Sequence, residues 1–436
     1  MIEALISDLV GPHFGILEQI QRVTPEPDDA ALEVYAGRLA NTEAFAELQA
    51  PLIASGAALD SAQAKAACLG EAVERYSAAL PPPGAIVHCR ADELSRTVVT
   101  PDRFSLFTAR QYRQSQQQFP FVHWYASQPI GWTQARCLTP ACSGSAAWLP
   151  ATFVWLPYAP APEEPLIAPC LSTGLACGPD GNSAMFSGLC EVIERDALAL
   201  AWLGKYAPPR IEVDFDDSGA PLSSIVDCIE RRGLQWSLFD LTTDLGVPVA
   251  GALVEGHSAV GWIVAAGSAC HPDPTRAMLK ALVEAAHCRM YVKSLLRTLP
   301  NWNAGRRFCN VTCFADHARL YSVYPQLWRP LDRWRRSRRT RRWVAMDVST
   351  DGAGLNDLVQ QLAASGYETY ALDLTLPDIA PLELSVARVI VPGLQPLHGN
   401  HAWPHLGGQR LAQWPRVFGS QSRRPLRWNR FPHPWA

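Results

Sequence analysis

Two short stretches of this chain carry the same pattern of charged residues. Residues 71–75 read Glu-Ala-Val-Glu-Arg, and residues 191–195 read Glu-Val-Ile-Glu-Arg. Glutamates three positions apart lie side by side on one face of a helix, so two such helices could bring their carboxylates and arginines into one pocket. Mg²⁺ binds carboxylate and phosphate oxygens, and arginine can bind a phosphate through two hydrogen bonds. The repeated motif therefore predicts a site for Mg²⁺ and a polyphosphate.

A solvated helix surface is the alternative interpretation of each copy. Leu69 and Val73 belong to the apolar stripe of the first helix, and Glu71 and Glu74 fall to one side of that stripe. The apolar face alone therefore does not decide whether these carboxylates meet water or a ligand. The repetition of the motif and its surroundings favour a ligand.

The surroundings of the motifs contain further chemical groups in a fixed order. A Ser-Thr-Gly sequence at residues 172–174 precedes the second motif, and residues 276–289 contain Glu284, His287 and Arg289. A fourth segment, residues 386–394, reads Val-Ala-Arg-Val-Ile-Val-Pro-Gly-Leu. In this order and spacing the segments resemble the YcaO family. More narrowly, they resemble its azoline-forming cyclodehydratases, the "D" proteins of thiazole/oxazole-modified microcin biosynthesis.

The resemblance covers roughly residues 55–436 and implies a function. The expected activity is ATP- and Mg²⁺-dependent cyclodehydration of Cys, Ser or Thr in a ribosomal precursor peptide, through phosphorylation of the backbone amide oxygen. It implies Mg²⁺ ligands at Glu71, Glu74, Glu191 and Glu194, and nucleotide-binding groups at Arg75, Arg195, Glu284 and Arg289. A thioamide-forming member of the family and a non-catalytic scaffold subunit of a peptide-modifying complex are the alternatives.

Several accessory positions depart from the family pattern while the four motif glutamates are retained. Ala57 stands where the family often has lysine, and Ala67 stands where serine is common. Pro179 and Ser183 replace an asparagine and a glutamate, and His287 replaces a glutamine. Because the lost groups supply single hydrogen bonds and the glutamates would hold the metal, the pattern of retention favours an active enzyme.

The last six residues form a second expected part of the active site. Azoline-forming members of the family tend to end in Pro-x-Pro-x-Pro, and this sequence ends with Pro432, Pro434 and then Ala436 in place of the last proline. Proline fixes φ, so such a segment enters a cleft with little loss of entropy. We expect Pro432, Pro434 and the Ala436 carboxylate to act at the active site, with a frayed terminus as the alternative.

Composition restricts the class of protein. The chain has 436 residues, 48% of them apolar and 18% charged, which is typical of a globular protein, and its net charge of −3 gives no indication of nucleic-acid binding. The start of the chain does not resemble a signal peptide, and the uncharged residues 137–162 contain too many prolines for a membrane span. The cysteines lack zinc-site spacing, so we expect reduced, buried thiols and a cytoplasmic protein.

A cluster of eight arginines occupies residues 329–342. A solvated insertion loop or edge is one interpretation, and a docking surface for a partner subunit or an acidic leader peptide is the other. No leader-binding module or flavin motif is evident in the sequence. The expected partners are therefore the precursor peptide, a separate leader-binding cyclodehydratase subunit and a flavin-dependent azoline dehydrogenase.

The elements that would position these residues alternate between helices and strands without a strict βαβ order, which predicts an α+β fold with mixed sheets and packed helices. We expect helices over about 61–79, 183–204, 274–298 and 355–364, and strands over 246–256, 261–268, 343–348, 369–372 and 386–391. The expected organisation is a helical lead-in over residues 1–50, one large YcaO-like domain over 51–420 and a proline-containing tail over 421–436.

Overall fold

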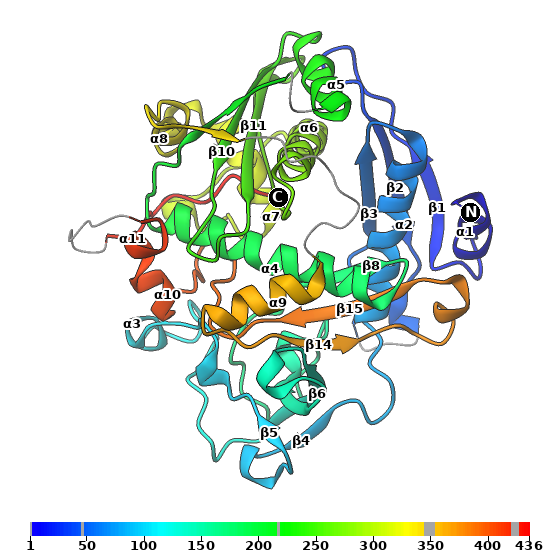
Figure 1. The fold of residues 1–436 in the computed structure, drawn as a ribbon, viewed down its shortest axis with the longest axis vertical. Coiled ribbons are helices and arrows are strands. Elements are labelled where there is room, and N and C mark those ends of the chain that lie inside the picture. Colours follow the sequence, from blue (N-terminus) through cyan, green and yellow to red (C-terminus); the bar gives the residue numbers. More distant parts are fainter. Residues whose placement is uncertain (1, 45–47, 216–218, 344–353, 420–426) are drawn as a thin grey trace.

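The computed structural model describes residues 2–44, 48–215, 219–343, 354–419 and 427–436. Within these ranges the chain forms three β-sheets of three, five and seven strands, with helices packed against and between them (Figure 1). Antiparallel and parallel strand pairs occur together, which confirms the α+β class. The helices are α1 (Ile2–Leu9), α2 (Ser61–Ala78), α3 (Ala109–Tyr112), α4 (Gly181–Leu203), α5 (Gly219–Glu230), α6 (Pro274–Thr298), α7 (Phe314–Val323), α8 (Arg329–Arg335), α9 (Leu355–Ala364), α10 (Gln409–Ala412) and α11 (Trp414–Val417).

The described part of the first fifty residues contains two strands and only one α-helix, of eight residues, which corrects the expectation of a helical lead-in. Helix α1 is followed by β1 (Leu17–Arg22) and β2 (Glu33–Leu39), and these strands form an antiparallel sheet with β3 (Ile53–Ala58). Helix α2 packs against β2 and β3. Since the helix covers one face, β3 alternates buried with more exposed residues, as half-buried strands do. The sheet therefore crosses the expected boundary at residue 50.

The five-stranded sheet carries the longest helix of the fold on one face. Its strand order is β12 (Gly261–Cys270), β11 (Val249–Ser258), β10 (Gln235–Asp240), β9 (Arg210–Val213) and β13 (Thr340–Trp343). β11 and β12 form an antiparallel hairpin, and helix α6 packs along both strands. Strand β13 lies at the sheet edge and pairs in parallel with β9. Residues 344–348 of the expected strand lie outside the described residues.

The arginine cluster forms regular structure rather than an insertion loop. Its first half is helix α8, and its second half enters the edge strand β13, so the edge interpretation fits better than the loop interpretation. Arg335 and Arg342 form ion pairs with Glu255 and Asp214. Several of these side chains therefore neutralise acidic groups of the same sheet.

The seven-stranded sheet lies on the opposite side of α4. Its path is β5 (Thr97–Val98), β7 (Ala146–Pro150), β6 (Ile130–Cys137), β14 (Tyr370–Asp373), β15 (Ser385–Ile390) and β8 (Leu175–Gly178), and β4 (Val87–Cys89) pairs with β6. Two strands from the second half of the chain, β14 and β15, thus lie between β6 and β8 of the first half. This arrangement places β8, which leads into the second motif helix, beside β15.

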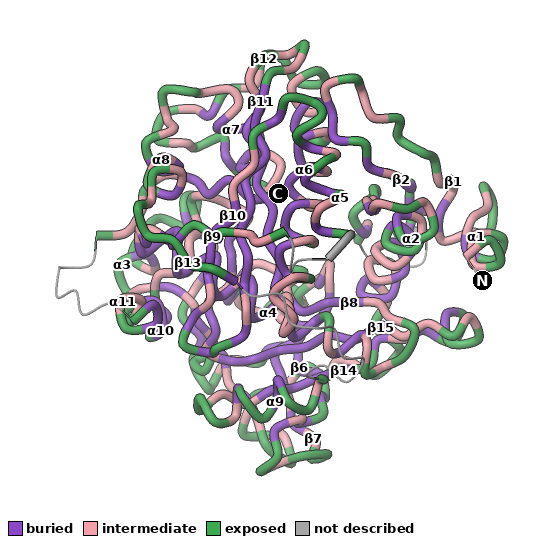
Figure 2. Tube along the Cα trace, turned by 45° about the horizontal axis from the view of Figure 1, so that its top comes forward, coloured by how far each residue is buried: buried purple, intermediate pink, exposed green. Residues whose placement is uncertain are grey.

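Helix α4 lies between the two larger sheets and forms the centre of the core (Figure 1). It packs against β8 and β15 on one side and against β11 and β12 on the other. Most of its residues from Ala184 to Leu203 are buried, as expected for a helix that is apolar around its circumference. Figure 2 shows the buried residues running through the centre of the molecule. Glu194 and Asp196 are nevertheless buried there as charged residues.

Two further expectations can be compared with the structure. Cys137 and Cys142 form a disulfide with an S–S distance of 2.04 Å, so the expectation of reduced thiols is wrong at this pair, although the other ten cysteines are free. Among the helices described, none combines the length and apolar character that crossing a membrane requires.

Candidate active site

Three strand–helix units of the fold each direct a glutamate toward one region. Helices α2, α4 and α6 begin at aspartate N-caps whose carboxylates accept backbone N–H groups of the first turn. A glutamate follows eleven residues after each cap, which is about three helical turns. The cap and glutamate pairs are Asp60 and Glu71, Asp180 and Glu191, and Asp273 and Glu284. The cap of α4 is thus Asp180.

Each of these glutamates also accepts a backbone N–H from the strand or loop beside its helix. The donors are Ser55 to Glu71 at 2.6 Å, Gly174 to Glu191 at 2.9 Å and Ser268 to Glu284 at 2.6 Å. Such bonds to an ionised carboxylate are stronger than those between neutral groups. The same local arrangement therefore fixes one carboxylate in each of the three units.

Close packing of strand on helix brings these donors within reach. A Cβ at Gly56 of β3 would lie 2.3 Å from the carbonyl oxygen of Ala64 in α2. A Cβ at Gly267 of β12 would lie 2.3 Å from the backbone nitrogen of Ala285 in α6. Glycine is required at both positions because no side chain fits between the two backbones.

The glutamates of the second and third units line one cavity of about 300 Å³ between α4, β12 and α6. Four predicted site residues contribute to it: Glu191, Glu194, Arg195 and Glu284. The other lining residues, which the sequence did not single out as site residues, are Phe186, Ser187, Cys190, Ser268, Ala269, Cys270, His271 and Lys280. Its volume lies at the lower end of the usual range of ligand pockets.

Ser268 of β12 joins the two helices across the cavity. Its hydroxyl donates to Glu194 at 2.6 Å, and its backbone N–H donates to Glu284. Burial and the neighbouring Glu194 raise the pKa of Glu284 to about 8. Carboxylates are therefore crowded in the cavity more closely than their mutual repulsion favours.

The first motif lies beside this cavity and faces the second motif. Burial raises the pKa of Glu74 well above its ordinary value, and the adjacent carboxylates of Glu191 and Glu71 raise it further. Arg75 forms an ion pair with Glu71 at 2.5 Å. The four motif glutamates and Glu284 thus form a series of neighbouring carboxylates contributed by α2, α4 and α6, although Glu71 and Glu74 do not line the cavity itself.

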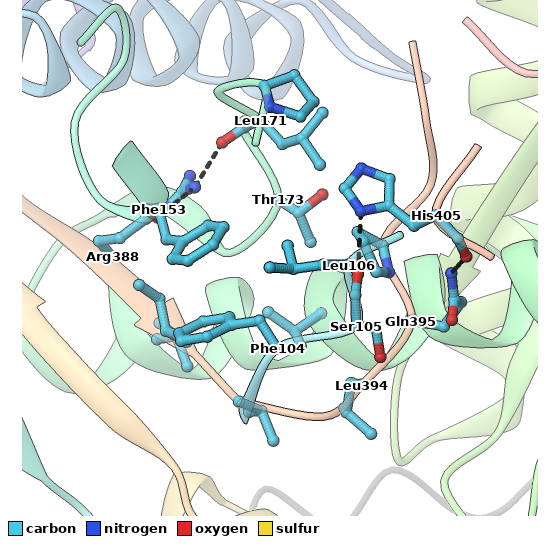
Figure 3. A pocket seen from close by; sticks show the side chains of 16 residues that line it. Phe104, Ser105, Leu106, Phe153, Leu171, Thr173, Arg388, Leu394, Gln395 and His405 are labelled. Carbon is cyan, nitrogen blue, oxygen red and sulfur yellow. Dashed lines mark hydrogen bonds between the residues drawn. The ribbon is translucent and has the colours of Figure 1, made fainter. Parts of the chain in front are cut away.

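Arg388 of β15 lies near Glu191 and Glu74. It belongs to the fourth segment of the sequence resemblance, but no role was assigned to it from the sequence. Its guanidinium donates to the carbonyl oxygen of Leu171 (Figure 3). It also donates to the carbonyl oxygens of Phe153 and, at 2.6 Å, of Ser172. Burial lowers its pKa to about 10, while the nearby carboxylates oppose this shift. Arg388 therefore anchors the loop that carries the Gly174 donor. A charged residue inside an apolar strand was the available signal.

Figure 3 also shows an apolar cavity of about 90 Å³ next to Arg388, lined by Phe104, Phe153 and Leu394 among others. It is too small and too apolar for a nucleotide. The cavity between α4 and α6 is the candidate for nucleotide binding because motif glutamates, Arg195 and Lys280 line it.

Arg289 does not line the cavity that contains Glu191, Glu194 and Glu284. It is buried in ion pairs with Asp29 at 2.5 Å and Asp28 at 3.2 Å, and it also donates to the carbonyl of His257. Five residues separate it from Glu284 on α6, which turns the two side chains about 140° apart. The residue thus fastens α6 to the N-terminal segment, where the structure gives it no contact with the cavity.

The C-terminal segment is packed into the molecule, so the frayed-terminus alternative is wrong. Pro432 and Pro434 are buried, Trp435 is 2% exposed, and Ala436 is exposed. The segment lies beside the end of α4, where the indole of Trp202 donates to the carbonyl of Phe431 at 2.8 Å. Trp202 follows Glu194 by about 12 Å along the helix axis. A catalytic role of Pro432, Pro434 and Ala436 stays a prediction.

The chemistry of the donor set fits Mg²⁺ and a nucleotide. Carboxylate oxygens are hard ligands of the kind that Mg²⁺ binds together with phosphate oxygens. Burial and, next, the neighbouring carboxylates raise the pKa values of Glu74 and Glu284, and a bound cation would favour their ionised forms. Arg195 and Lys280 line the same cavity and can bind phosphate oxygens.

Comparison with known proteins assigns the family. Residues 55–395 match the model of the YcaO cyclodehydratases, described as ATP- and Mg²⁺-binding. The chain therefore belongs to the YcaO family, and ATP and Mg²⁺ are confirmed as the cofactors of the family. An uncharacterised protein from the tfuA 3′ region of Rhizobium leguminosarum bv. trifolii is 30% identical over 62% of either chain. An uncharacterised protein of Methanothermobacter thermautotrophicus is 26% identical over 61% of this chain and 60% of its own.

Solved structures share the fold. A heterocyclase in complex with substrate and cofactor superposes with a TM-score of 0.77 at 23% identity, covering 100% of this chain and 57% of its own. The heterocyclase TruD gives a TM-score of 0.64 at 25% identity over 85% of this chain and 50% of its own. YcaO from Methanopyrus kandleri, bound with AMPPCP and Mg²⁺, gives a TM-score of 0.60 at 20% identity, and the match covers 94% of this chain and 91% of its own. The chain thus spans roughly half the length of the two heterocyclases.

Proposed function

We propose that this protein is an ATP- and Mg²⁺-dependent peptide cyclodehydratase that forms thiazoline or oxazoline rings in a ribosomal precursor peptide. The observation that carries the proposal is the cavity lined by Glu191, Glu194 and Glu284 together with Arg195 and Lys280. The carboxylate of Glu74 on α2 lies beside Glu191 and extends this series. Membership of the YcaO family and the likeness to heterocyclase structures support it.

The reaction explains the need for ATP. The side-chain sulfur or oxygen of a Cys, Ser or Thr loses its proton to a base and adds to the preceding carbonyl carbon, and the carbonyl oxygen becomes an alkoxide. That oxygen is a poor leaving group until it accepts the γ-phosphoryl of ATP with release of ADP. Loss of phosphate and of the amide proton then forms the C=N bond of the ring. Most of the catalysis expected from the protein is positioning and charge neutralisation.

The named residues have distinct proposed roles. Glu71, Glu74, Glu191 and Glu194 would hold Mg²⁺, which neutralises phosphate charge when it is bound. Arg195 and Lys280 would bind phosphate oxygens, and Glu284 would complete the site from α6. Arg75 would hold Glu71 in place through their ion pair. Arg388 would hold the loop that donates to Glu191.

The partners belong to the same proposal. The E. coli microcin synthetase McbBCD complex, which is also known with pro-MccB17 bound, shares the fold with a TM-score of 0.56 at 14% identity. By analogy we propose a precursor peptide as the substrate and a separate leader-binding subunit. A flavin-dependent dehydrogenase would then oxidise the azoline rings.

Binding of AMPPCP with Mg²⁺ to the purified chain, measured by calorimetry, tests the site directly. We expect one nucleotide per chain and a marked loss of affinity in Glu194→Gln. Glu163→Gln is the matched control because Glu163 is exposed and remote in sequence from the motifs. Absence of nucleotide binding by the wild-type chain would contradict the proposal and favour the scaffold alternative.

Mass spectrometry of the precursor, incubated with the partner subunit, ATP and Mg²⁺, tests the chemistry. Each ring removes one water from the peptide. A product that instead exchanges oxygen for sulfur would identify the thioamide-forming alternative.

A further inference from the structure

Three buried histidines from distant parts of the chain meet at one point. His317 lies on α7, His398 lies in the segment after β15, and His433 lies near the C-terminus. One ring nitrogen of each lies within 4.8 Å of the others. The ring of His433 stacks on that of His317 with centroids 3.7 Å apart, and its centroid is 5.2 Å from that of His398.

Hydrogen bonds to carbonyl groups fix the protonation of two of these rings. His317 Nδ1 lies 3.2 Å from the carbonyl oxygen of His433, so Nδ1 carries the proton. His433 Nε2 lies 2.9 Å from the carbonyl oxygen of His398 and is likewise the donor. The other nitrogen of each ring therefore keeps a free lone pair. This pattern, with one nitrogen donating to a carbonyl, is the usual second contact of a metal-bound histidine.

The free nitrogens have no other partner among the described residues. His317 Nε2, His433 Nδ1 and His398 Nδ1 are buried without a hydrogen bond. A buried polar atom without a partner is unfavourable, so three of them in one place call for a ligand. Burial also lowers the pKa of all three imidazoles, which keeps them neutral, as metal ligation requires.

We propose that His317, His398 and His433 bind one divalent transition metal of the Zn²⁺ type. Imidazole nitrogen suits Zn²⁺ and its neighbours in the first transition series, whereas Mg²⁺ prefers oxygen. To reach Zn–N distances of about 2.0–2.1 Å, the stacked rings of His317 and His433, which are inclined by only 11°, have to rotate so that their free nitrogens converge on one ion. His401, whose ring centroid is 6.0 Å from that of His317, is the nearest candidate for a fourth ligand.

The metal would fasten the C-terminal segment to the body of the protein. Tyr321 of α7 already donates to the carbonyl of Pro432 at 2.5 Å, and Trp202 of α4 donates to that of Phe431. His433 adds a contact that joins this segment to α7 and to the segment after β15. The site would therefore hold together three parts of the chain that are far apart in the sequence, and it is distinct from the carboxylate series.

Metal analysis of the tag-free chain tests the proposal. The protein is stripped of metal, incubated with Zn²⁺ or Co²⁺ and freed of excess metal. The bound metal is then quantified by elemental mass spectrometry. We expect one equivalent to remain bound and the Co²⁺ form to show visible absorption bands of a low-symmetry site. X-ray absorption of the Zn²⁺ form should show imidazole nitrogen neighbours at about 2.0 Å.

Variants locate the metal. His398→Gln and His433→Gln should each lower metal affinity at least tenfold, while His13→Gln, at an exposed histidine, should leave it unchanged. Glu194→Gln should also retain the metal, which separates this site from the Mg²⁺ site. If the variants fail to fold, the wild-type spectra decide by themselves. Failure of the wild-type chain to retain metal, sulfur ligands in the absorption spectrum, or full retention by folded His398→Gln would overturn the proposal and leave bridging water as the occupant.

Discussion

Glu194, on α4, is the most deeply buried glutamate of the site, with 8% of its surface exposed. Its two oxygens accept from Ser268 Oγ at 2.6 Å and from the backbone N–H of Cys270 at 3.2 Å. A glutamine can keep both contacts, because its oxygen can accept from Cys270 and its amide can donate to the hydroxyl of Ser268. The substitution therefore removes the charge while preserving the local packing.

Glu194→Gln should abolish ring formation without unfolding the protein. Loss of one charged contact costs ~1.5–3 kcal/mol, which is roughly a 10–100-fold rise in the Kd for AMPPCP with Mg²⁺. Calorimetry measures the Kd, and thermal unfolding monitors the fold. Unchanged nucleotide affinity in the variant would remove Glu194 from the proposed metal ligands.

Crowding of the carboxylates should make the stability of the metal-free protein fall as the pH rises. The pKa of Glu284 is about 8 in the folded protein against an ordinary value of 4.5, so between these values the folded state holds one proton more than the unfolded state. Raising the pH through this window therefore lowers the free energy of unfolding, by at most about 1.4 kcal/mol per pH unit for one group.

Thermal unfolding near pH 6 and near pH 8, with and without Mg²⁺, measures this dependence. Mg²⁺ should raise Tm more at the higher pH, because it replaces the proton on the carboxylates. Glu284→Gln should flatten the pH dependence of the metal-free protein. If the Tm of this variant depends on pH as strongly as that of the wild type, Glu284 is not the titrating group.

At the scale of the elements, local signals predicted the helices well. Helix caps and prolines can be recognised in the sequence, so α6 begins at Pro274 as expected. The observed bounds of α2 and α9 agree with the expected bounds to within a residue. Strands β1 and β2 were missed because they are exposed on one face and lack a clear apolar alternation. The equal interval between each cap and its glutamate was readable in the sequence and would have identified Glu284 as the third copy of the pattern.

Residues that act through tertiary contacts could not be placed from the sequence. Lys280 lies one turn before Glu284 and shares its face of α6, but nothing local shows that this face meets α4. Arg289 belongs to the expected family motif, yet its partners are Asp28 and Asp29 on a segment 260 residues away. Only the packing of α6 against that segment determines which groups face the cavity.

The C-terminal segment should contribute to stability as well as to function. Trp435 packs in the core against Trp202 and Trp334, with ring centroids 5.8 Å and 5.4 Å away. Trp435→Ala should lower the free energy of unfolding by ~3–5 kcal/mol, because it leaves a large cavity. Deletion of residues 432–436 should therefore also lower the free energy of unfolding.

Denaturant unfolding of Trp435→Ala measures the loss, and AMPPCP binding by the folded fraction provides the control. We expect nucleotide affinity within about threefold of the wild type, since the segment lies about 12 Å along α4 from Glu194. A stability change below ~1 kcal/mol would indicate that the indole is not part of the core.

At the scale of the whole molecule, the arginine cluster divides into two groups. Arg335 and Arg341 are used within the fold, through ion pairs with Glu255 and, at 2.7 Å, with Asp240. Arg329 and Arg338 are exposed. A docking surface for an acidic partner would therefore depend on the second group, and the first group would mainly support the five-stranded sheet.

Replacing Arg329 and Arg338 by serine should weaken association with the leader-binding subunit, and the difference from wild type should shrink as salt rises. Arg341→Ser is the informative control, because it should lower thermal stability instead. Titration calorimetry at low and high ionic strength measures both effects. If the double variant binds the partner as tightly as the wild type at low salt, the arginine cluster has a purely structural role.

An aspartate cap, a glutamate and a backbone N–H that donates to the glutamate recur together as one module in three places. This repetition has a consequence for how relatives of the protein lose activity. The first two modules continue with a second glutamate and an arginine, whereas the third has His287 and Cys288 at those positions. Each module contributes its glutamate from a different helix, so the three copies are not interchangeable, and loss of one glutamate is not compensated by another. A relative that has abandoned catalysis should therefore reveal itself by decay of the glutamates in any single module while the aspartate caps, which serve folding alone, persist in all three.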